Sequence, residues 1–152
     1  MEFSVDAHEF NDMAKKYAGA TPIIEQELTK GMRRISYIGF NHAVEVVPVK
    51  TGRLKGSIAP DTKRDGKDFV AIVGTKTEYA KAVEFGTGPH VILPKNKRAL
   101  YWAGQKHPWA SVMHPGTKAQ PYLRPALKKM IEAAPRELAT AARKALARIG
   151  GR

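Results

Sequence analysis

The spacing of apolar residues along the chain predicts helices at the two ends and strands between them. Residues 10–17 place apolar side chains at helical intervals, which predicts a first amphipathic helix. Residues 24–35 repeat that spacing and predict a longer second helix. Thr21 would be its N-cap and Pro22 its first residue, where the missing N–H has no cost. This helix must end before Pro48, because the residue before a proline is disfavoured in helical geometry.

After Pro48 the period changes from that of a helix to that of a strand. Residues 54–59 alternate apolar and polar side chains, and residues 69–73 form a short β-branched run, so both are predicted strands. The Asp65-Gly66 pair between them is a strong hairpin signal and predicts antiparallel neighbours. Residues 78–85 then predict a short helix that stops at Gly86.

The segment from residue 88 to residue 117 lacks a clear period. Two apolar runs, residues 91–93 and 99–102, flank a polar turn and predict a second, longer hairpin. Irregular segments of this length usually have a function, often in binding. Trp102 and Trp109 both lie here, and tryptophan is more typical of an interface than of a solvated loop.

The last segment is again helical. Pro135 either kinks this helix or opens a second one, and Gly150 and Gly151 end it. Gly31 and Gly39 in the second helix are interpreted as sites of close packing against a neighbour. The predicted apolar stripe of the last helix consists of Leu123, Leu127, Met130, Ile131, Leu138, Leu146 and Ile149.

These elements predict an α+β fold, with a small antiparallel sheet packed by N-terminal and C-terminal helices and a long extended β-hairpin or loop arm. One domain over residues 1–152 is expected. Its parts are a helical N-terminal region (1–47), a sheet core (48–87), the extended arm (88–117) and a C-terminal helix (118–150).

The chain is strongly basic, with a net charge of +12 and an isoelectric point near 10.0. Such a field favours nucleic acid or an acidic protein surface. No signal peptide or membrane-spanning run is visible, so a soluble protein made in a cytoplasm is expected. The basic residues that cluster around the predicted first hairpin are Lys50, Arg53, Lys55, Lys63 and Arg64.

No catalytic, metal or cofactor site is predicted. The chain has no cysteine, and its five histidines never pair at the i, i+4 spacing of a helical metal site. Neither a phosphate-cradling loop nor a nucleophile elbow is present, and Gly86-Thr87-Gly88 is interpreted as a helix cap and turn. The sequence thus contains no residue set for a reaction.

Three islands of sequence carry a resemblance when they are taken in order. Residues 48–58 (PVKTGRLKGSI) couple a turn to the start of a predicted strand. Residues 73–87 end a strand and form the short helix, and residues 115–127 (PGTKAQPYLRPAL) lead into the final helix. Their order and spacing resemble the neck, or tail-completion, proteins that join head and tail in long-tailed bacteriophages, many of which are described as tail components. The resemblance covers roughly residues 44–130.

Most of the residues in these islands are expected to be scaffold. Gly52 permits the tight turn before Leu54 enters the sheet, Tyr79 and Phe85 anchor the ends of the short helix in the core, and Pro121 fixes the entry of the last helix. The family-motif positions are Pro48, Thr51, Gly52, Leu54, Ser57, Gly74, Tyr79, Phe85, Gly86, Pro115, Gly116, Pro121, Leu123 and Pro125.

The resemblance implies a structural virion protein without enzymatic activity or cofactor. It would form a homo-oligomeric ring, a hexamer in most such proteins, at the head–tail junction. Its partners would be head-closure or connector proteins on one side and tail-terminator or tail-tube proteins on the other, with DNA passing through the lumen as a further candidate. The arm residues expected at the subunit or partner interface are Val91, Ile92, Leu93, Lys95, Lys97, Arg98, Tyr101, Trp102 and Trp109, and Lys106 adds charge.

Two other classes of function are alternatives to this one. The basic charge also suits a nucleic-acid-binding protein, although no helix–turn–helix, zinc finger or RNA-recognition motif is visible. An enzyme such as a nuclease or lysin would need a residue set that the sequence does not offer.

Overall fold

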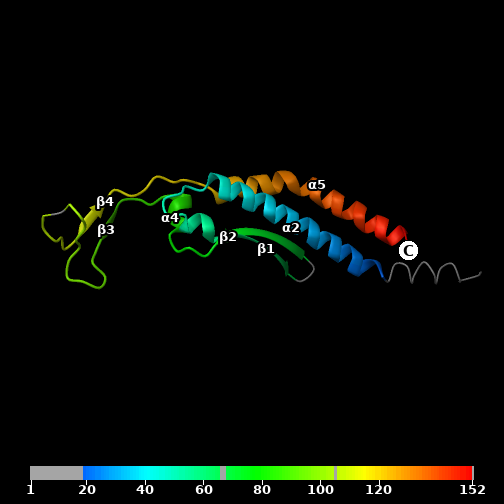
Figure 1. Ribbon diagram of the computed structural model, residues 1–152, viewed down its shortest axis with the longest axis horizontal. Coiled ribbons are helices and arrows are strands. Elements are labelled where there is room, and N and C mark those ends of the chain that lie inside the picture. Colours follow the sequence, from blue (N-terminus) through cyan, green and yellow to red (C-terminus); the bar gives the residue numbers. More distant parts are fainter. Residues whose placement is uncertain (1–18, 66–67, 105, 152) are drawn as a thin grey trace, which may run out of the picture.

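A computed structural model describes residues 19–65, 68–104 and 106–151. Two long helices lie side by side, a two-stranded ribbon packs along them, and an arm extends from one end (Figure 1). This arrangement confirms the predicted α+β fold, with two small antiparallel sheets and long helices on either side of the strands in the chain order. The helix predicted near residues 10–17 lies outside the described residues.

The helices α2 (Ala20–Val46) and α5 (Leu123–Gly150) form an antiparallel pair. In α2 the buried positions recur every four residues from Ile23 to Ala43 and include both predicted packing glycines. A Cβ atom at Gly31 would lie 3.2 Å from that of Ala141, and one at Gly39 would collide with the side chain of Met130. The absence of a side chain at these two positions therefore lets the helices approach closely, as predicted.

The predicted apolar stripe of α5 was largely wrong. The residues that α5 buries are Ala126, Met130, Ala141, Ala145 and Ile149, whereas Leu127, Ile131, Leu138 and Leu146 are exposed. The physical reason is the close approach of α2: a seam of glycine and alanine admits short side chains, so the leucines lie outside it. Pro135 does not open a second helix, because α5 continues through that residue.

The start of α2 also differs from the prediction. The helix begins at Ala20 and its N-cap is Gly19, which makes no side-chain capping bond. Thr21 is thus already helical, and Pro22 lies within the first turn, where a proline still breaks no intrahelical hydrogen bond. The predicted end is confirmed, because the helix stops at Val46, two residues before Pro48.

The strands β1 (Ile58–Asp65) and β2 (Asp68–Thr75) pair antiparallel, as the hairpin signal predicted. The prediction of a strand from residue 54 was wrong: Arg53–Ser57 forms the short helix α3, which Gly52 precedes with φ of +76°. Leu54 therefore reaches the core from a helical turn. Alternation over only a few residues fits either structure, and here the buried Leu54 and Ile58 are also one helical turn apart.

The short helix α4 (Ala80–Phe85) ends at Gly86, whose φ of +73° favours glycine. The prediction that Tyr79 and Phe85 anchor it in the core was wrong, since both rings are exposed. Ala80 and Glu84, four residues apart on the opposite face, are buried instead. The core around them joins α2, α3, β1 and the start of α5 through Ala43, Val47, Leu54, Ile58, Ala80, Tyr122 and Ala126.

Candidate assembly surfaces: the arm and its anchor

The arm, residues 88–117, lies between α4 and α5 and projects away from the helix pair (Figure 1). At its base Thr87 and Thr117 exchange two backbone hydrogen bonds of 3.0 Å. Further out, β3 (His90–Ile92) pairs antiparallel with β4 (Val112–His114). An isolated bridge between Leu100 and Trp109 closes the outer part.

The second predicted hairpin therefore has a different pairing from the one expected. Residues 91–93 were predicted to pair with residues 99–102 across the polar turn. Instead, β3 pairs with β4, and Leu100 pairs with Trp109. The partner of β3 therefore lies farther along the chain than predicted. Local spacing favours the shorter loop, whereas the fixed ends of the arm leave room for two pairings, one nested inside the other.

Two glycines fix the arm to the body. Gly86 and Gly116 both have positive φ, and each packs against the opposite side of the base. A Cβ atom at Gly116 would overlap the carbonyl oxygen of Thr87, and one at Gly86 would lie 2.6 Å from that of Thr117. The two chains of the base can approach this closely only without side chains at these positions.

No described residue of the arm is buried. The exposed fraction is 63% for Leu93, 68% for Tyr101 and 44% for Trp102, and Lys95, Lys97 and Arg98 are exposed as well. The predicted interface residues Val91, Ile92 and Trp109 are also exposed, as is Met113. The arm is thus a projection rich in large apolar side chains that its own body does not cover.

Glu84 joins the base of the arm to the start of α5. Its carboxylate accepts the backbone N–H groups of Tyr122, Leu123 and Arg124 at 2.7, 2.9 and 3.0 Å, and the Arg124 Nε at 3.1 Å. These are N–H groups that a helix start leaves without an intrahelical partner. A side chain from α4 thereby caps α5.

Two opposing effects act on the pKa of Glu84. Burial raises it, because the side chain is only 4% exposed, but the hydrogen bonds from the three backbone N–H groups and from Arg124 outweigh burial and lower it. Arg124 also lies 5.0 Å from the centre of the Phe85 ring. The exposed Phe85 ring thus has a cation–π partner in the Arg124 guanidinium.

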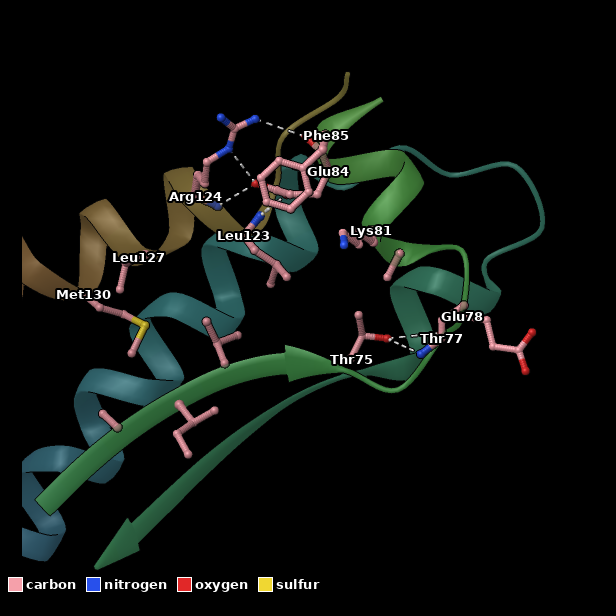
Figure 2. Close-up of a pocket in the computed structure, with 14 residues that line it drawn as sticks. Thr75, Thr77, Glu78, Lys81, Glu84, Phe85, Leu123, Arg124, Leu127 and Met130 are labelled. Atoms are coloured by element: carbon pink, nitrogen blue, oxygen red, sulfur yellow. Dashed lines mark hydrogen bonds and ion pairs between the residues drawn. The ribbon is translucent and has the colours of Figure 1, made fainter. Parts of the chain in front are cut away.

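Beside this anchor lies an apolar groove of about 530 Å³ between β2, α4 and the first turns of α5 (Figure 2). Ile72 and Val73 of β2 line one side, and Leu127 and Met130 of α5 line the other. Thr75 and Thr77 lie at one end, where their hydroxyls bond to Ser57 of α3 at 2.6 Å each. The family-motif residue Ser57 thus ties α3 to the end of β2.

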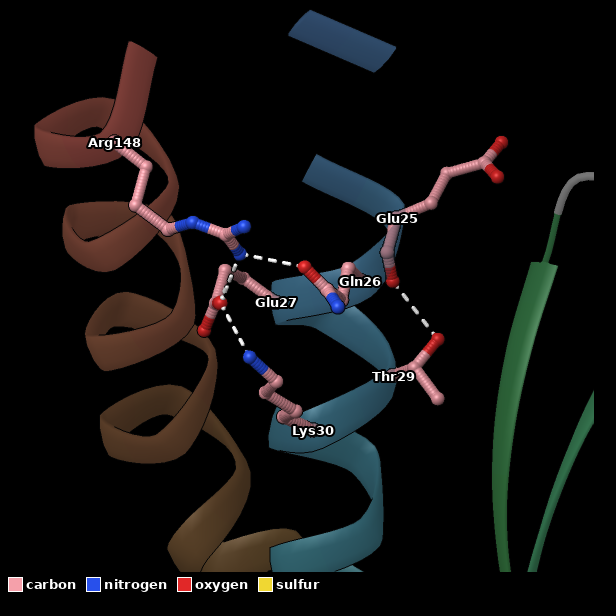
Figure 3. Close-up of polar contacts among 6 residues, drawn as sticks. All are labelled: Glu25, Gln26, Glu27, Thr29, Lys30 and Arg148. Atoms are coloured by element: carbon pink, nitrogen blue, oxygen red, sulfur yellow. Dashed lines mark hydrogen bonds and ion pairs between the residues drawn. The ribbon is translucent and has the colours of Figure 1, made fainter. Parts of the chain in front are cut away.

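A second buried acid holds the opposite end of the helix pair. Glu27 of α2 accepts hydrogen bonds from Lys30 at 2.8 Å and from Arg148 of α5 at 2.6 Å, and Arg148 also bonds to Gln26 (Figure 3). The bond from Lys30 is the main cause that lowers the pKa of Glu27, and burial opposes it. Charged contacts therefore pin α5 at both ends, to α4 by Glu84 and to α2 by Glu27.

The remaining motif positions support turns and element starts. Gly52 has the left-handed geometry expected of it, Gly86 ends α4 as expected, Leu54 is buried, and Pro121 immediately precedes the N-cap of α5. Gly74 lies in β2 with open space around it. Pro48 and Thr51 lie between α2 and α3, Pro115 and Gly116 lie at the return of the arm, and Leu123 and Pro125 lie in the first turn of α5.

Sequence reasoning missed Glu84, Glu27 and the stacked pair His90 and His114. Each of these depends on a partner far along the chain: Glu84 meets residues 38–40 positions away, and the two imidazole rings stack at 5.1 Å across the β3–β4 ladder. No local signal points to Glu84, because the helix start that it caps lies 38–40 residues farther along the chain. In the described part of the chain, no group of three or more histidine, aspartate or glutamate residues could hold a metal ion.

The basic cluster around the hairpin is partly neutralised within the chain. Arg64 forms two hydrogen bonds of 2.7 Å with Glu25 of α2, and Lys63 lies 4.0 Å from Asp61. Lys50, Arg53 and Lys55 are exposed near α3. None of the described helices is long and apolar enough to cross a bilayer.

Comparison with known proteins gives one match. Residues 8–86 match the family model described as "Bacteriophage HK97-gp10, putative tail-component", which covers α2, α3, β1, β2 and α4 and ends where the arm begins. No curated protein and no solved structure matches the chain. The first sequence island lies within the matched segment, the second lies within it except for Thr87, and the third lies beyond it. The match extends over half of the chain, and the protein therefore belongs to the HK97-gp10-like family of bacteriophage tail components.

Proposed function

We propose that this protein is a structural subunit of a homo-oligomeric ring at the head–tail junction of a long-tailed phage, where it joins the connector to the tail. Membership of a tail-component family supports a place in the virion. The observation that carries the proposal is the arm, whose large apolar side chains are exposed on a projection clear of the body. Apolar surface concentrated in this way marks interaction sites in soluble proteins.

A ring needs two different surfaces on each subunit, because a head-to-tail contact repeated by rotation joins unlike faces. The arm supplies a projecting face, and the body supplies the other. The basic residues Lys95, Lys97 and Arg98 on the arm suit an acidic surface on an adjoining ring of the neck. A ring of six is the form that the neck-protein resemblance implies. The proposal involves no catalytic step.

Replacement of residues 90–112 by a short Gly-Ser linker tests this function. The Thr87–Thr117 bridge and the Glu84 cap lie outside the deletion, so we expect a folded body with an unchanged circular dichroism spectrum. Solution mass should show a monomer, and a phage that carries the variant should accumulate unjoined heads and tails. Rings and infectious particles from the variant would contradict the proposal.

Contact with nucleic acid is the second candidate, and it is favoured by the +12 charge and by the exposed Lys50, Arg53 and Lys55. A ring around passing DNA needs only weak phosphate contacts, whereas a dedicated binding protein needs tight ones whose affinity falls steeply with salt. A gel-shift titration distinguishes them. Tight binding by the free protein at about 150 mM salt, near physiological ionic strength, would favour the second candidate.

A further inference from the structure

The groove beside β2 is an apolar surface that the chain itself leaves open. It has a volume of about 530 Å³, within the range of roughly 300–1,000 Å³ that encloses drug-sized ligands, so it can accept more than one large side chain. Its walls include Ile72 and Leu127, and the exposed fraction of Leu127 is 52%. Ile131 continues the exposed apolar surface one turn farther along α5.

An unpaired strand edge borders this groove. Among the described residues β2 pairs with β1 alone, and the groove is lined by residues 71–73 and 75 of β2 but by none of β1 (Figure 2). The groove therefore follows the edge of β2 that faces away from β1. Such an edge offers backbone N–H and C=O groups to an added extended segment, while neighbouring pockets receive its side chains.

Charge restricts where on the body the basic arm of a second copy can bind. Between Leu123 and Gly150, α5 has seven lysine or arginine residues against two glutamates, so most of this helix repels a basic arm. The groove is balanced, since Glu78 and Lys81 lie on its rim and Glu84 pairs with Arg124. An arm segment with Lys95, Lys97 and Arg98 next to apolar residues therefore meets less repulsion at the groove than along the rest of α5.

The arm cannot fill the groove of its own subunit. The Thr87–Thr117 bridge and the two positive-φ glycines fix its base, and it points away from β2 (Figure 1). The geometry points to the groove as the seat for the arm of a neighbouring copy, which enters as an extended segment along β2 and places Leu93 and Trp102 between β2 and α5. This inference rests on the proposed ring and names its two contacting faces.

Cysteine cross-linking tests the contact directly, because the chain has no native cysteine. One full-length variant carries Asn96→Cys in the arm, and a second carries Lys81→Cys on the groove rim. When the two variants are mixed and oxidised, an arm that lies in the groove of a second copy should give a disulfide-linked heterodimer. The product reports contact, because a disulfide forms only between residues whose Cα atoms come within about 7 Å. The matched control replaces the second variant by Lys144→Cys, an exposed lysine in the C-terminal half of α5, and should give several-fold less product.

A substitution pair gives an independent readout. Leu127→Glu places a charge in the groove wall, where Leu127 is 52% exposed, and Leu146→Glu places one outside the groove, at a leucine of the same helix that is 68% exposed. We expect the first to weaken self-association by about tenfold or more and the second to leave it within about twofold, because burial of an unpaired carboxylate is costly. Circular dichroism verifies that both variants are folded.

The outcomes separate this inference from the ring itself. If the wild type forms rings while both readouts match their controls, the groove is not the seat of the arm, although the ring itself stands. If the wild type stays monomeric and no cross-link forms, both proposals are overturned.

Discussion

The helix pair contains buried large apolar side chains, whereas the described part of the arm contains none. Ile23, Ile35 and Met130 are buried between α2, α5 and the strands, whereas every large apolar residue described in the arm between Val91 and Met113 is at least partly exposed. The arm is held at its base by backbone hydrogen bonds and glycine geometry rather than by a core of its own. Substitutions in the body should therefore change the free energy of unfolding, and those in the outer arm should change association.

The largest effect is expected at the cap between the two regions. Glu84→Ala removes the acceptor of three backbone N–H groups at the start of α5 and leaves them buried or partly buried. We expect a loss of about 3 kcal/mol in the free energy of unfolding, since charged hydrogen bonds contribute roughly 1.5–3 kcal/mol and unsatisfied donors add to the loss. Urea denaturation measures it. A loss below about 0.5 kcal/mol, the range of ordinary surface changes, would show that α5 does not depend on this cap.

The same carboxylate predicts the direction of the pH dependence. The folded-state pKa of Glu84 is lowered below its ordinary value of 4.5, so its contribution is fully present above that value and is lost as the pH falls through the folded pKa. Glu27 and Glu137 shift in the same direction, because Lys30 and Arg34 respectively donate hydrogen bonds to them. The wild type should lose stability in acid, and Glu84→Gln should lose less over the same interval. If the denaturation midpoints of the two proteins fall in parallel as the pH is lowered, this prediction is contradicted.

The seam of the helix pair should show the next effect. Gly31→Leu forces a side chain against Ala141, where even a Cβ atom would be at 3.2 Å. Overpacking of this kind costs about 1–3 kcal/mol, which a gain in helix propensity near 1 kcal/mol offsets only in part. Thermal unfolding measures the loss, and Gly56→Leu, with open space around its Cβ position, is the matched control. Equal stability of the two variants would mean that the helices can separate without cost.

A smaller and local effect is expected at the base of the arm. Gly116→Ala places a methyl group against the Thr87 carbonyl at a φ of +91°. The strain should be about 1 kcal/mol or more and should open the Thr87–Thr117 bridge. Hydrogen exchange should quicken at Thr87 and Thr117 while α2 and α5 keep their protection. Uniform loss of protection would show that base and body unfold together.

The smallest effect on stability is expected in the outer arm. Trp102→Ala should change the free energy of unfolding by less than about 0.5 kcal/mol, because surface substitutions rarely exceed that value. Its effect on self-association should be larger, since tryptophan is enriched among the residues that dominate interfaces. A solution mass measurement over a dilution series checks this. If Trp102→Ala unfolds the monomer and leaves association intact, the contrast between body and arm is wrong.

The sequence by itself determined the features that depend on neighbouring residues. Pro48 set the end of α2 because a proline restrains the residue before it, and the Asp65-Gly66 pair predicted the β1–β2 hairpin. Gly52 adopts the left-handed geometry expected at a turn, Gly86 ends α4, and Gly31 and Gly39 lie where two helices meet. The exposed aromatic arm was also visible as an irregular segment with both tryptophans.

Only the tertiary structure decided the features that depend on distant partners. The seam of α5 follows alanines rather than leucines because α2 presents glycines to it, and β3 pairs with β4 because the fixed base of the arm brings them together. The alternation over residues 54–59 fits both periods, and packing selects the helix in which Leu54 lies. Glu84 became a helix cap only when the fold placed α4 beside the start of α5, since a hydrogen bond across 38–40 residues leaves no trace in local spacing.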